Sequence, residues 1–180
     1  MSHGYQIKDQ ESLYYLTFQV VSWVDIFTRV AYKDIVIDSF KYCIDKKGLE
    51  LYAFVIMTNH IHLIARAKEG FMMSDIIRDF KKFTANRILD QIKLPSESRR
   101  DWMLKRFEFA AKNHQRNSEY QFWTHENHPI ELFSKEFIGQ KLHYIRHTVR
   151  AGIVENAEEY IYSSAKNYAG MKGILDVLFV

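Results

Sequence analysis

The sequence is poor in the features that mark secreted, membrane-spanning or unfolded chains. It has one cysteine, two prolines and seven glycines among 180 residues. A lone cysteine excludes an intramolecular disulfide framework and a multi-cysteine zinc module. No apolar run approaches the roughly 18 residues of a membrane helix, and the amino terminus, MSHGYQIKDQES, lacks the apolar core of a signal peptide. We therefore expect a cytoplasmic protein with no membrane partner.

Apolar and aromatic residues are plentiful. Hydrophobic residues make up 47% of the chain, aromatic residues 15% and charged residues 26%, which excludes disordered and low-complexity classes. The length favours a single domain over residues 1–180, with a core at about 13–152 and a C-terminal tail at 153–180. The tail ends in the apolar run ILDVLFV, which could cover the core of its own chain or a second copy, so a homodimer is one expectation.

Positive charge is concentrated in one part of the chain. The net charge is only +3, but the stretch 75–116 holds eleven lysines and arginines against six acidic residues. Such a surplus can attract nucleic-acid phosphates by releasing counterions. Two solvated helix faces would produce the same pattern, so charge alone does not decide between them.

The order of apolar patterns predicts an alternation of strands and helices. The expected strands cover 13–23, 51–57, 60–65 and 121–124, and the expected helices cover 30–46, 74–92, 97–112 and 135–149. The tight link between 51–57 and 60–65 predicts a hairpin, and Pro129 makes the last strand an edge strand at most. We expect Phe83 on the buried side of its helix. The whole order favours an α+β fold, with helices packed on an antiparallel sheet.

Two histidines in the second hairpin strand form the first candidate site. His60 and His62 are two positions apart, so a strand would place both imidazoles on one face and Ile61 on the other. Two adjacent imidazoles are a common start for a divalent metal site, which needs further ligands from elsewhere. A pair of partly buried, hydrogen-bonded histidines is the alternative.

A tyrosine in the last long helix is the second candidate. The apolar residues of that helix follow one another at intervals of about one turn and so form a stripe along one side. Tyr144 points away from this stripe, on a flank with Gln140, His147 and Thr148. The stripe consists of Ile138, Leu142, Ile145 and Val149. A phenol with a pKa near 10 becomes a useful nucleophile only if a metal or a base stabilises the developing charge. Ordinary amphipathic packing is the alternative reading.

Four stretches, in this order, carry a family resemblance. They read LYAFVIMTNHIHLIARAKEG, IIRDFKKFTANRI, QFWTHENHPIEL and KLHYIRHTVRAGIVENAEEYIYSSAKNYAG. From about residue 13 to residue 170 the chain resembles the HUH single-tyrosine transposases, and within them the REP-associated tyrosine transposases. The resemblance implies a ferredoxin-like antiparallel sheet with helices packed on it.

The resemblance also implies a reaction. His60 and His62 would hold Mg²⁺ or Mn²⁺, and Tyr144 would attack a phosphodiester of single-stranded DNA, forming a 5′-phosphotyrosine and freeing a 3′-OH. Family members commonly carry an asparagine four residues after the tyrosine, followed by a proline, whereas this chain has Thr148 and no proline. The third metal ligand therefore stays open among Thr148, His147 and Gln140, and this copy could be impaired.

The DNA expected from the resemblance is a hairpin formed by an imperfect palindrome, with adjacent single-stranded DNA. Positive side chains of two helices are candidates for phosphate contacts, and Trp123 is a candidate for stacking an unpaired base. The positive candidates are Arg78, Lys81, Lys82, Arg99, Arg100, Lys105 and Arg106.

Three functions follow from these residues. The first is a metal-dependent DNA strand transferase that cuts and rejoins single-stranded DNA at hairpins through Tyr144. The second is a DNA-hairpin binding protein that kept the fold and lost catalysis. The third is an unrelated metal-dependent hydrolase in which Tyr144 is structural.

Overall fold

Alternating apolar strands pair into one antiparallel sheet. The computed structural model describes residues 7–113, 119–150 and 153–180, with backbone only for 147–150. Four strands pair within these ranges, in the order β2-β3-β1-β4. They are β1 (Tyr14–Gln19), β2 (Leu49–Ile56), β3 (His60–Ala67) and β4 (Ile130–Glu131). The hairpin predicted for β2 and β3 is confirmed, since the two strands pair antiparallel across a short turn.

Two strand predictions were wrong in detail. The first strand ends at Gln19, because residues 21–23 turn away as a short 3₁₀ segment, η1 (Val21–Trp23). The edge strand expected at 121–124 is absent from the described structure, where Trp123 forms only an isolated bridge with Val20. The edge strand β4 instead follows Pro129, which leaves the proline outside the hydrogen-bonded ladder.

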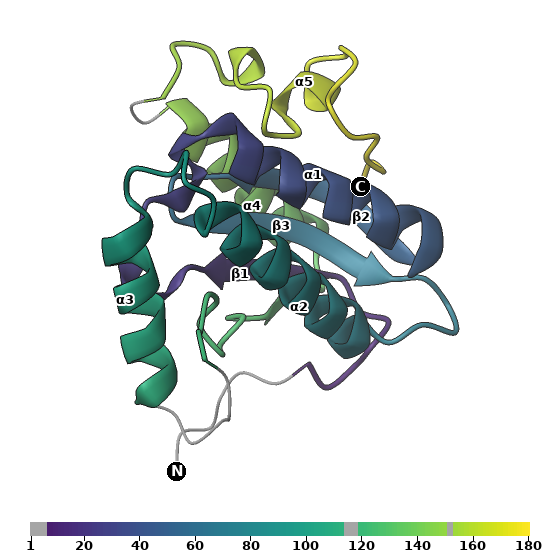
Figure 1. Ribbon diagram of the computed structural model, residues 1–180. Helices are drawn as coiled ribbons and strands as arrows, with labels where there is room; N and C mark the ends of the chain where they lie inside the picture. The colour runs from purple at the N-terminus through teal and green to yellow at the C-terminus, as the bar shows by residue number, and fades with distance from the viewer. Residues whose placement is uncertain (1–6, 114–118, 151–152) are drawn as a thin grey trace.

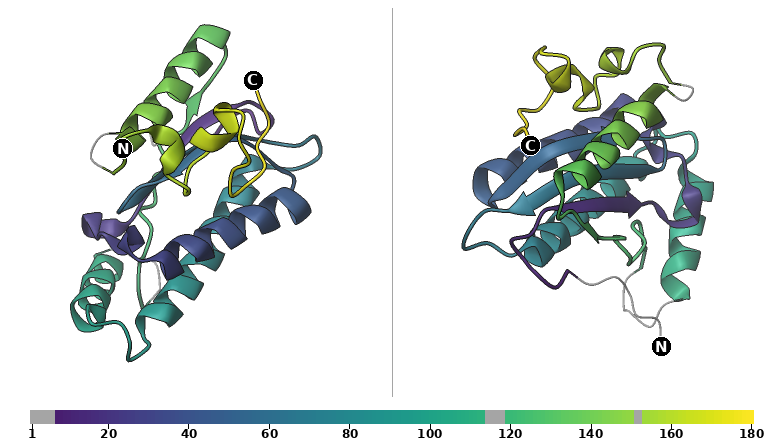
Figure 2. Two further views of the ribbon diagram at one scale, coloured as in Figure 1. Left: turned by 90° about the horizontal axis from the view of Figure 1, so that it is seen from above. Right: turned by 180° about the vertical axis from the view of Figure 1, so that it is seen from behind.

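Helices cover both faces of the sheet. The long ones are α1 (Val30–Lys46), α2 (Met73–Ile92), α3 (Arg100–Lys112) and α4 (Lys135–Arg150), and a single turn, α5 (Ala165–Tyr168), follows. Helices α1 and α2 lie on one face and α4 crosses the other, while α3 stands at one end of the sheet (Figures 1 and 2). The α+β fold predicted from the element order is confirmed. No helix within the described residues is long and apolar enough to cross a bilayer.

Local sequence explains where the helices begin and end. Helix α1 spans the predicted residues and stops before Gly48, whose φ of +70° is the left-handed conformation that glycine adopts without strain. Helix α4 begins where Ser134 Oγ accepts the backbone N–H of Phe137 at 3.2 Å, as an N-cap does. Phe83 is 51% exposed and does not join the core, contrary to the prediction, because the buried stripe of α2 runs through other positions.

Strand alternation divides the apolar side chains into two clusters. The larger cluster lies under α1 and α2 and includes Phe18, Phe40, Phe54 and Phe80. The smaller cluster lies under α4 and includes Tyr15, Tyr52, Val55, Ile64 and Ile145. Since β1 and β3 contribute alternate residues to each side, the α4 face also receives the polar side chains of these strands.

The C-terminal tail packs against its own chain. The backbone N–H of Ile56 donates to Tyr162 O at 3.0 Å, and the N–H of Ser164 donates to Phe54 O at 2.9 Å. Further along, the N–H of Leu178 donates to Leu51 O at 2.9 Å. The tail therefore covers the free edge of β2, which is the first of the two roles expected for it.

Candidate active site

Both strand histidines face α4. Their ring centroids are 4.6 Å apart, while Ile61 between them is buried in the cluster on the opposite face. In the ladder, His60 lies across from Gln19 and His62 across from Thr17. The alternation predicted from the sequence is confirmed, and it brings two imidazoles together on the surface that α4 covers.

His62 is held in one orientation and is uncharged. It is 6% exposed, and its Nδ1 lies 2.8 Å from Tyr15 Oη and 3.0 Å from Thr17 Oγ1. Burial, with the neighbouring charges of His60 and Lys141, lowers its pKa to about 3, so the ring is neutral at pH 7. Its Nε2 is buried and has no hydrogen-bond partner within the described residues.

His60 is oriented by its neighbour in the turn. Its Nδ1 lies 2.7 Å from Asn59 Oδ1, and burial lowers its pKa. The orientation of the Asn59 amide is fixed because its Nδ2 donates to the carboxylate of Asp25 at 2.9 Å, and a carboxylate only accepts. Asn59 Oδ1 must then accept the Nδ1 proton of His60, which leaves the lone pair of His60 on Nε2.

Tyr144 contacts His62 from α4. Its side chain is 50% exposed, and its ring lies 5.6 Å from that of His62 and 6.3 Å from that of Tyr15, edge-on to both. Residues 62 and 144 are distant in sequence but in ring contact. They meet because α4 crosses the face of the sheet that includes β3 (Figure 2). Of the predicted flank, Tyr144 itself is the residue that the structure places against His62.

The histidines suit a divalent metal, and the third ligand predicted for it is not settled by the described residues. A metal-binding histidine usually donates its second ring N–H to an oxygen, as His60 does to Asn59, and the unpartnered Nε2 of His62 is a buried donor atom of the kind a metal would satisfy. No group of three histidine, cysteine, aspartate or glutamate side chains gathers within the described residues. Gln140 is exposed on α4, and the side chains of His147 and Thr148 lie outside the described residues.

Four residues around the site were missed by the sequence reasoning. Tyr15 and Thr17 are hydrogen-bonded to His62, and Asn59 is hydrogen-bonded to His60. Lys141 Nζ lies 4.7 Å from the centroid of the Tyr15 ring. Lys141 places a positive charge beside the site, which suits an anionic phosphate. Their signal was present: Tyr15 and Thr17 alternate like the histidines, and Lys141 precedes Tyr144 by three residues on the same helix.

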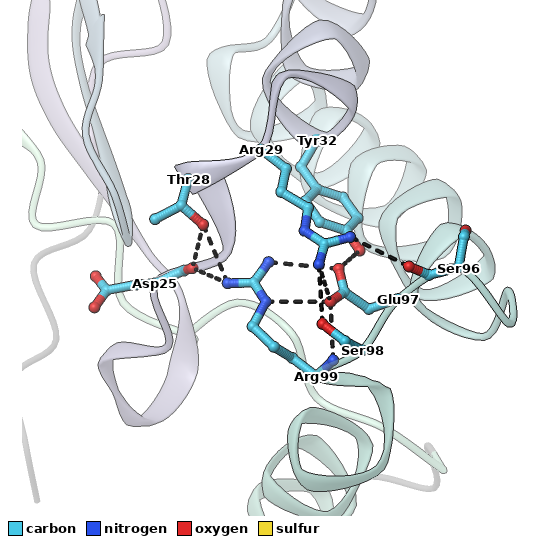
Figure 3. A network of polar contacts seen from close by, with 8 residues as sticks. All are labelled: Asp25, Thr28, Arg29, Tyr32, Ser96, Glu97, Ser98 and Arg99. Atoms are coloured by element: carbon cyan, nitrogen blue, oxygen red, sulfur yellow. Dashed lines mark hydrogen bonds and ion pairs between the residues drawn. The ribbon is translucent and has the colours of Figure 1, made fainter.

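One DNA-binding candidate is engaged in a buried network instead (Figure 3). The carboxylate of Glu97, 4% exposed, accepts hydrogen bonds from Tyr32 Oη at 2.5 Å and from Arg99 Nε at 3.2 Å, and pairs with Arg29 at 3.1 Å. Burial alone would raise the pKa of Glu97, but the hydrogen bonds from Arg99 and Tyr32 lower it to about 2. Arg99 also donates to Asp25 O at 3.0 Å. The network as a whole therefore joins α1, the α2–α3 turn and the segment before α1.

Two further candidates lie within the structure and give little surface for DNA. Lys81 Nζ donates to Thr124 O at 2.8 Å and to Asn127 Oδ1 at 2.6 Å, and burial lowers its pKa to about 8. Trp123 is 5% exposed, and its Nε1 donates to Thr84 Oγ1 at 3.0 Å. Both residues attach the segment 121–127 to α2, so their packing does not support the phosphate contact and base stacking predicted for them.

The remaining positive candidates are at the surface. Arg78 pairs with Asp75 at 2.6 Å and with Asp79 at 3.0 Å, and Arg100 pairs with Asp101 at 3.0 Å. The exposed candidates on these two helices also include Lys82, Lys105 and Arg106. Helices α2 and α3 thus keep part of the predicted positive surface, with Arg78 and Arg100 already beside acidic neighbours.

A family model described as "Transposase IS200 like" matches residues 12–135, which is more than two thirds of the chain and includes both histidines. The chain belongs to the IS200-like transposase family. The match ends at Lys135, the first residue of α4, so Tyr144 lies beyond it. The family makes this protein a DNA transposase by class. No curated protein sequence matches the chain.

Two solved structures are similar to this transposase. A REP-associated tyrosine transposase bound to a REP hairpin is similar over 100% of this chain and 95% of its own, with a TM-score of 0.62 and 16% identity. A "putative transposase" from Deinococcus radiodurans R1 matches over 82% of this chain and 97% of its own, with a TM-score of 0.45 and 18% identity. The first similarity supports the sheet and helix arrangement described above.

Proposed function

We propose that this transposase cleaves and rejoins single-stranded DNA at hairpin sites, with Tyr144 as the nucleophile and Mg²⁺ or Mn²⁺ held by His60 and His62. The observation that supports this most is the position of Tyr144, whose ring lies 5.6 Å from His62 across the junction of α4 and β3. The hairpin bound by the REP-associated transposase of the same fold supports hairpin DNA as the partner.

The reaction exchanges one phosphodiester for another. The Tyr144 oxygen loses its proton and bonds to phosphorus, the bond from phosphorus to the 3′ oxygen breaks, and that oxygen leaves as a 3′-OH after taking up a proton. The 5′-phosphotyrosine keeps the energy of the phosphodiester, so the 3′-OH of a second strand can reverse the step without ATP. A bound divalent metal would polarise the scissile phosphate and neutralise charge on the leaving oxygen.

The side chains around Tyr144 prepare the site for this reaction. Asn59 holds the lone pair of His60 on Nε2, and burial keeps His62 neutral, so neither ring must lose a proton to bind a metal. Lys141, above the Tyr15 ring, supplies a positive charge beside the reacting phosphate. Tyr144 itself is half exposed and accessible to DNA.

A second candidate function is a DNA-hairpin binding protein that has lost catalysis. It is favoured by Thr148, which stands where the resembled family commonly has asparagine. A hydroxyl is a weaker ligand than an amide or carboxylate oxygen, so such a site would hold metal poorly.

One experiment separates the two functions. Labelled single-stranded hairpin DNA from the genomic flanks is incubated with the protein in Mn²⁺ or EDTA and analysed on a denaturing gel. The transferase predicts a covalent adduct that requires Mn²⁺, is lost in Tyr144→Phe and persists in Tyr42→Phe, an exposed tyrosine of α1 on the opposite face. Salt-sensitive binding without an adduct would support the second function, and neither binding nor an adduct would contradict both.

A further inference from the structure

The segment 20–29, between β1 and α1, lies between the candidate active site and the buried network of Glu97. On one side its backbone contacts the turn between β2 and β3. The N–H of Val20 donates to Asn59 O at 2.9 Å, and the N–H of Phe27 donates to Thr58 O at 2.9 Å. Asn59 immediately precedes His60, the first of the two histidines. The segment therefore supports the turn that carries His60.

Asp25, in the middle of this segment, fixes the side chain of Asn59. Its carboxylate accepts a hydrogen bond from Asn59 Nδ2 at 2.9 Å, whereas Trp23 O lies 3.5 Å from the same atom. Because a carboxylate only accepts, Asn59 must turn its Oδ1 towards His60 Nδ1, 2.7 Å away. An amide released from Asp25 is free to rotate by half a turn and offer its N–H to His60 instead. The ring would then accept at Nδ1 and carry its proton on Nε2, where a metal would have to displace it.

The main chain of Asp25 is held from the opposite direction. Asp25 O accepts a hydrogen bond from Arg99 Nη1 at 3.0 Å, and the same Nη1 donates to Thr28 Oγ1 at 3.1 Å. In Figure 3 the Asp25 carboxylate extends away from Glu97, while its carbonyl faces Arg99. One residue thus connects the two regions, with its side chain on Asn59 and its carbonyl on the buried network.

Arg99 is suited to this connection by the shape of its side chain. Its Nε and Nη2 donate to the two carboxylate oxygens of Glu97 at 3.2 and 3.4 Å, and Glu97 is 4% exposed. A guanidinium is planar and its N–H groups have fixed directions, so it can hold Glu97 on one side and Asp25 and Thr28 on another. A lysine ammonium carries the same charge without this geometry.

We infer that Arg99 and Asp25 are positioning residues that act on His60 through Asn59. Glu97 holds Arg99, and Arg99 holds the main chain of Asp25. Asp25 in turn holds the Asn59 amide, which keeps the proton of His60 on Nδ1 and leaves Nε2 free for a metal. This inference rests on the proposed function, because it concerns a ligand of the metal named there. It gives Arg99 a role in place of the phosphate contact predicted from the sequence.

The first test uses Asp25→Ala in the full chain. The variant keeps the carbonyl that Arg99 holds and removes only the carboxylate of an exposed residue, so we expect it to fold. In metal-free protein near neutral pH, ¹H–¹⁵N NMR of the imidazoles should show the His60 proton on Nδ1 in the parent and shifted towards Nε2 in Asp25→Ala. Calorimetric titration should show Mn²⁺ affinity lowered about 2- to 30-fold, the range for residues that act through an intermediate contact.

Asp38→Ala, at an exposed acid of α1, is the matched control and should leave both quantities unchanged. If Asp25→Ala has the same His60 tautomer and the same Mn²⁺ affinity as this control, the inference is overturned.

The second test compares Arg99→Lys with Arg100→Lys. Both variants keep the positive charge, but only the first loses a guanidinium that holds Glu97 and Asp25 together. Arg99→Lys should weaken Mn²⁺ binding and shift the His60 proton in the same direction as Asp25→Ala, while hairpin DNA binding in EDTA stays as in the parent. Arg100→Lys, at an exposed arginine paired with Asp101, should change none of these. Mn²⁺ affinities equal in the two lysine variants would contradict the role of Arg99.

A third measurement separates positioning from general loss of stability. In an Asn59→Ala background, neither Asp25→Ala nor Arg99→Lys should weaken Mn²⁺ binding further, because both act through the amide that is already absent. Urea unfolding shows that each variant is folded at the temperature used. Effects on Mn²⁺ affinity that simply add to that of Asn59→Ala would show that the residues do not act through Asn59.

The two proposals can fail separately. If the unmodified protein forms the adduct while Asp25→Ala leaves the His60 tautomer and Mn²⁺ affinity unchanged, the proposed function stands and this inference falls. If no adduct forms but the tautomer of the metal-free protein depends on Asp25 and Arg99, the positioning holds in a protein that does not cut DNA.

Discussion

The two faces of the sheet are built from the same strands but have different contents. The face under α1 and α2 is mainly apolar, with stacked and tilted rings such as Phe40, Phe54 and Phe80 and no buried histidine within the described residues. The face under α4 places His62 and Thr17 beside a smaller apolar cluster, with the half-exposed Tyr144 above them. One face thus supplies stability, while the other holds polar groups that a fully packed core would exclude.

The largest expected effect comes from removing a candidate metal ligand on the α4 face. His62→Ala should reduce Mn²⁺-dependent adduct formation at least about 100-fold, because loss of a ligand exceeds the effect of losing its supporting hydrogen bond. The free energy of unfolding should change far less than in a core variant of the other face. Adduct yield and urea unfolding measure the two effects, and an adduct yield equal to that of the unmodified protein would contradict the metal assignment.

A core variant of the opposite face should show the reverse pattern. Phe40 is 1% exposed and stacks on Phe80 with ring centroids 4.6 Å apart, so Phe40→Ala should lower the free energy of unfolding by about 3–5 kcal/mol. At a temperature where the variant is folded, the adduct should still form. Urea unfolding gives the first quantity and the denaturing gel the second. A folded variant without adduct would show that the two faces are not independent.

The buried carboxylate of Glu97 should make stability depend on pH. Its pKa is about 2 in the folded protein against 4.5 as the ordinary value, so its contribution is present above about pH 4.5 and is lost as the pH falls towards 2. That shift corresponds to stability on the order of 3 kcal/mol. Glu97→Gln should be less stable at pH 7 and should lose part of this acid dependence, whereas Asp38→Asn, at an exposed acid of α1, should behave like the parent. Parallel curves for Glu97→Gln and the parent would argue against the depressed pKa.

The smallest of these effects concerns the orientation of His60. Asn59→Ala removes the acceptor of the His60 Nδ1 proton, which should weaken Mn²⁺ binding about 10- to 100-fold. Asn86→Ala, at an exposed asparagine of α2, is the matched control. Calorimetric titration with Mn²⁺ measures the difference, and equal affinities in the two variants would refute the orienting role of Asn59.

Local patterns predicted those features that depend on local physics. The i, i+2 spacing of His60 and His62 fixed their common face, the hairpin followed from its short turn, and the apolar stripe of α4 fixed the flank of Tyr144. The first and the last follow from the periodicity of a strand or a helix, and the hairpin follows from the length of one link, so a single sequence is enough to predict all three.

The features that the sequence reasoning missed depend on partners far along the chain. From the sequence, Arg99 and Lys81 look like free surface charges. In the structure Arg99 pairs with the buried Glu97, and Lys81 bonds the segment 121–127, which packs against α2. From the sequence, Trp123 has the features of a residue that stacks a DNA base. In the structure its indole donates a hydrogen bond to Thr84, 39 positions away. Charge and aromatic content do not reveal such pairings.

The most direct test of the central claim is peptide mapping of the covalent product by mass spectrometry. The protein is incubated with hairpin DNA and Mn²⁺, trimmed with nuclease and protease, and the peptide bearing the nucleotide is sequenced. We expect the nucleotide on Tyr144, in a sample that contained Mn²⁺ and in none that contained EDTA. A nucleotide attached to another residue, or cleavage of the DNA with no attached nucleotide, would contradict the assignment of Tyr144 as the nucleophile.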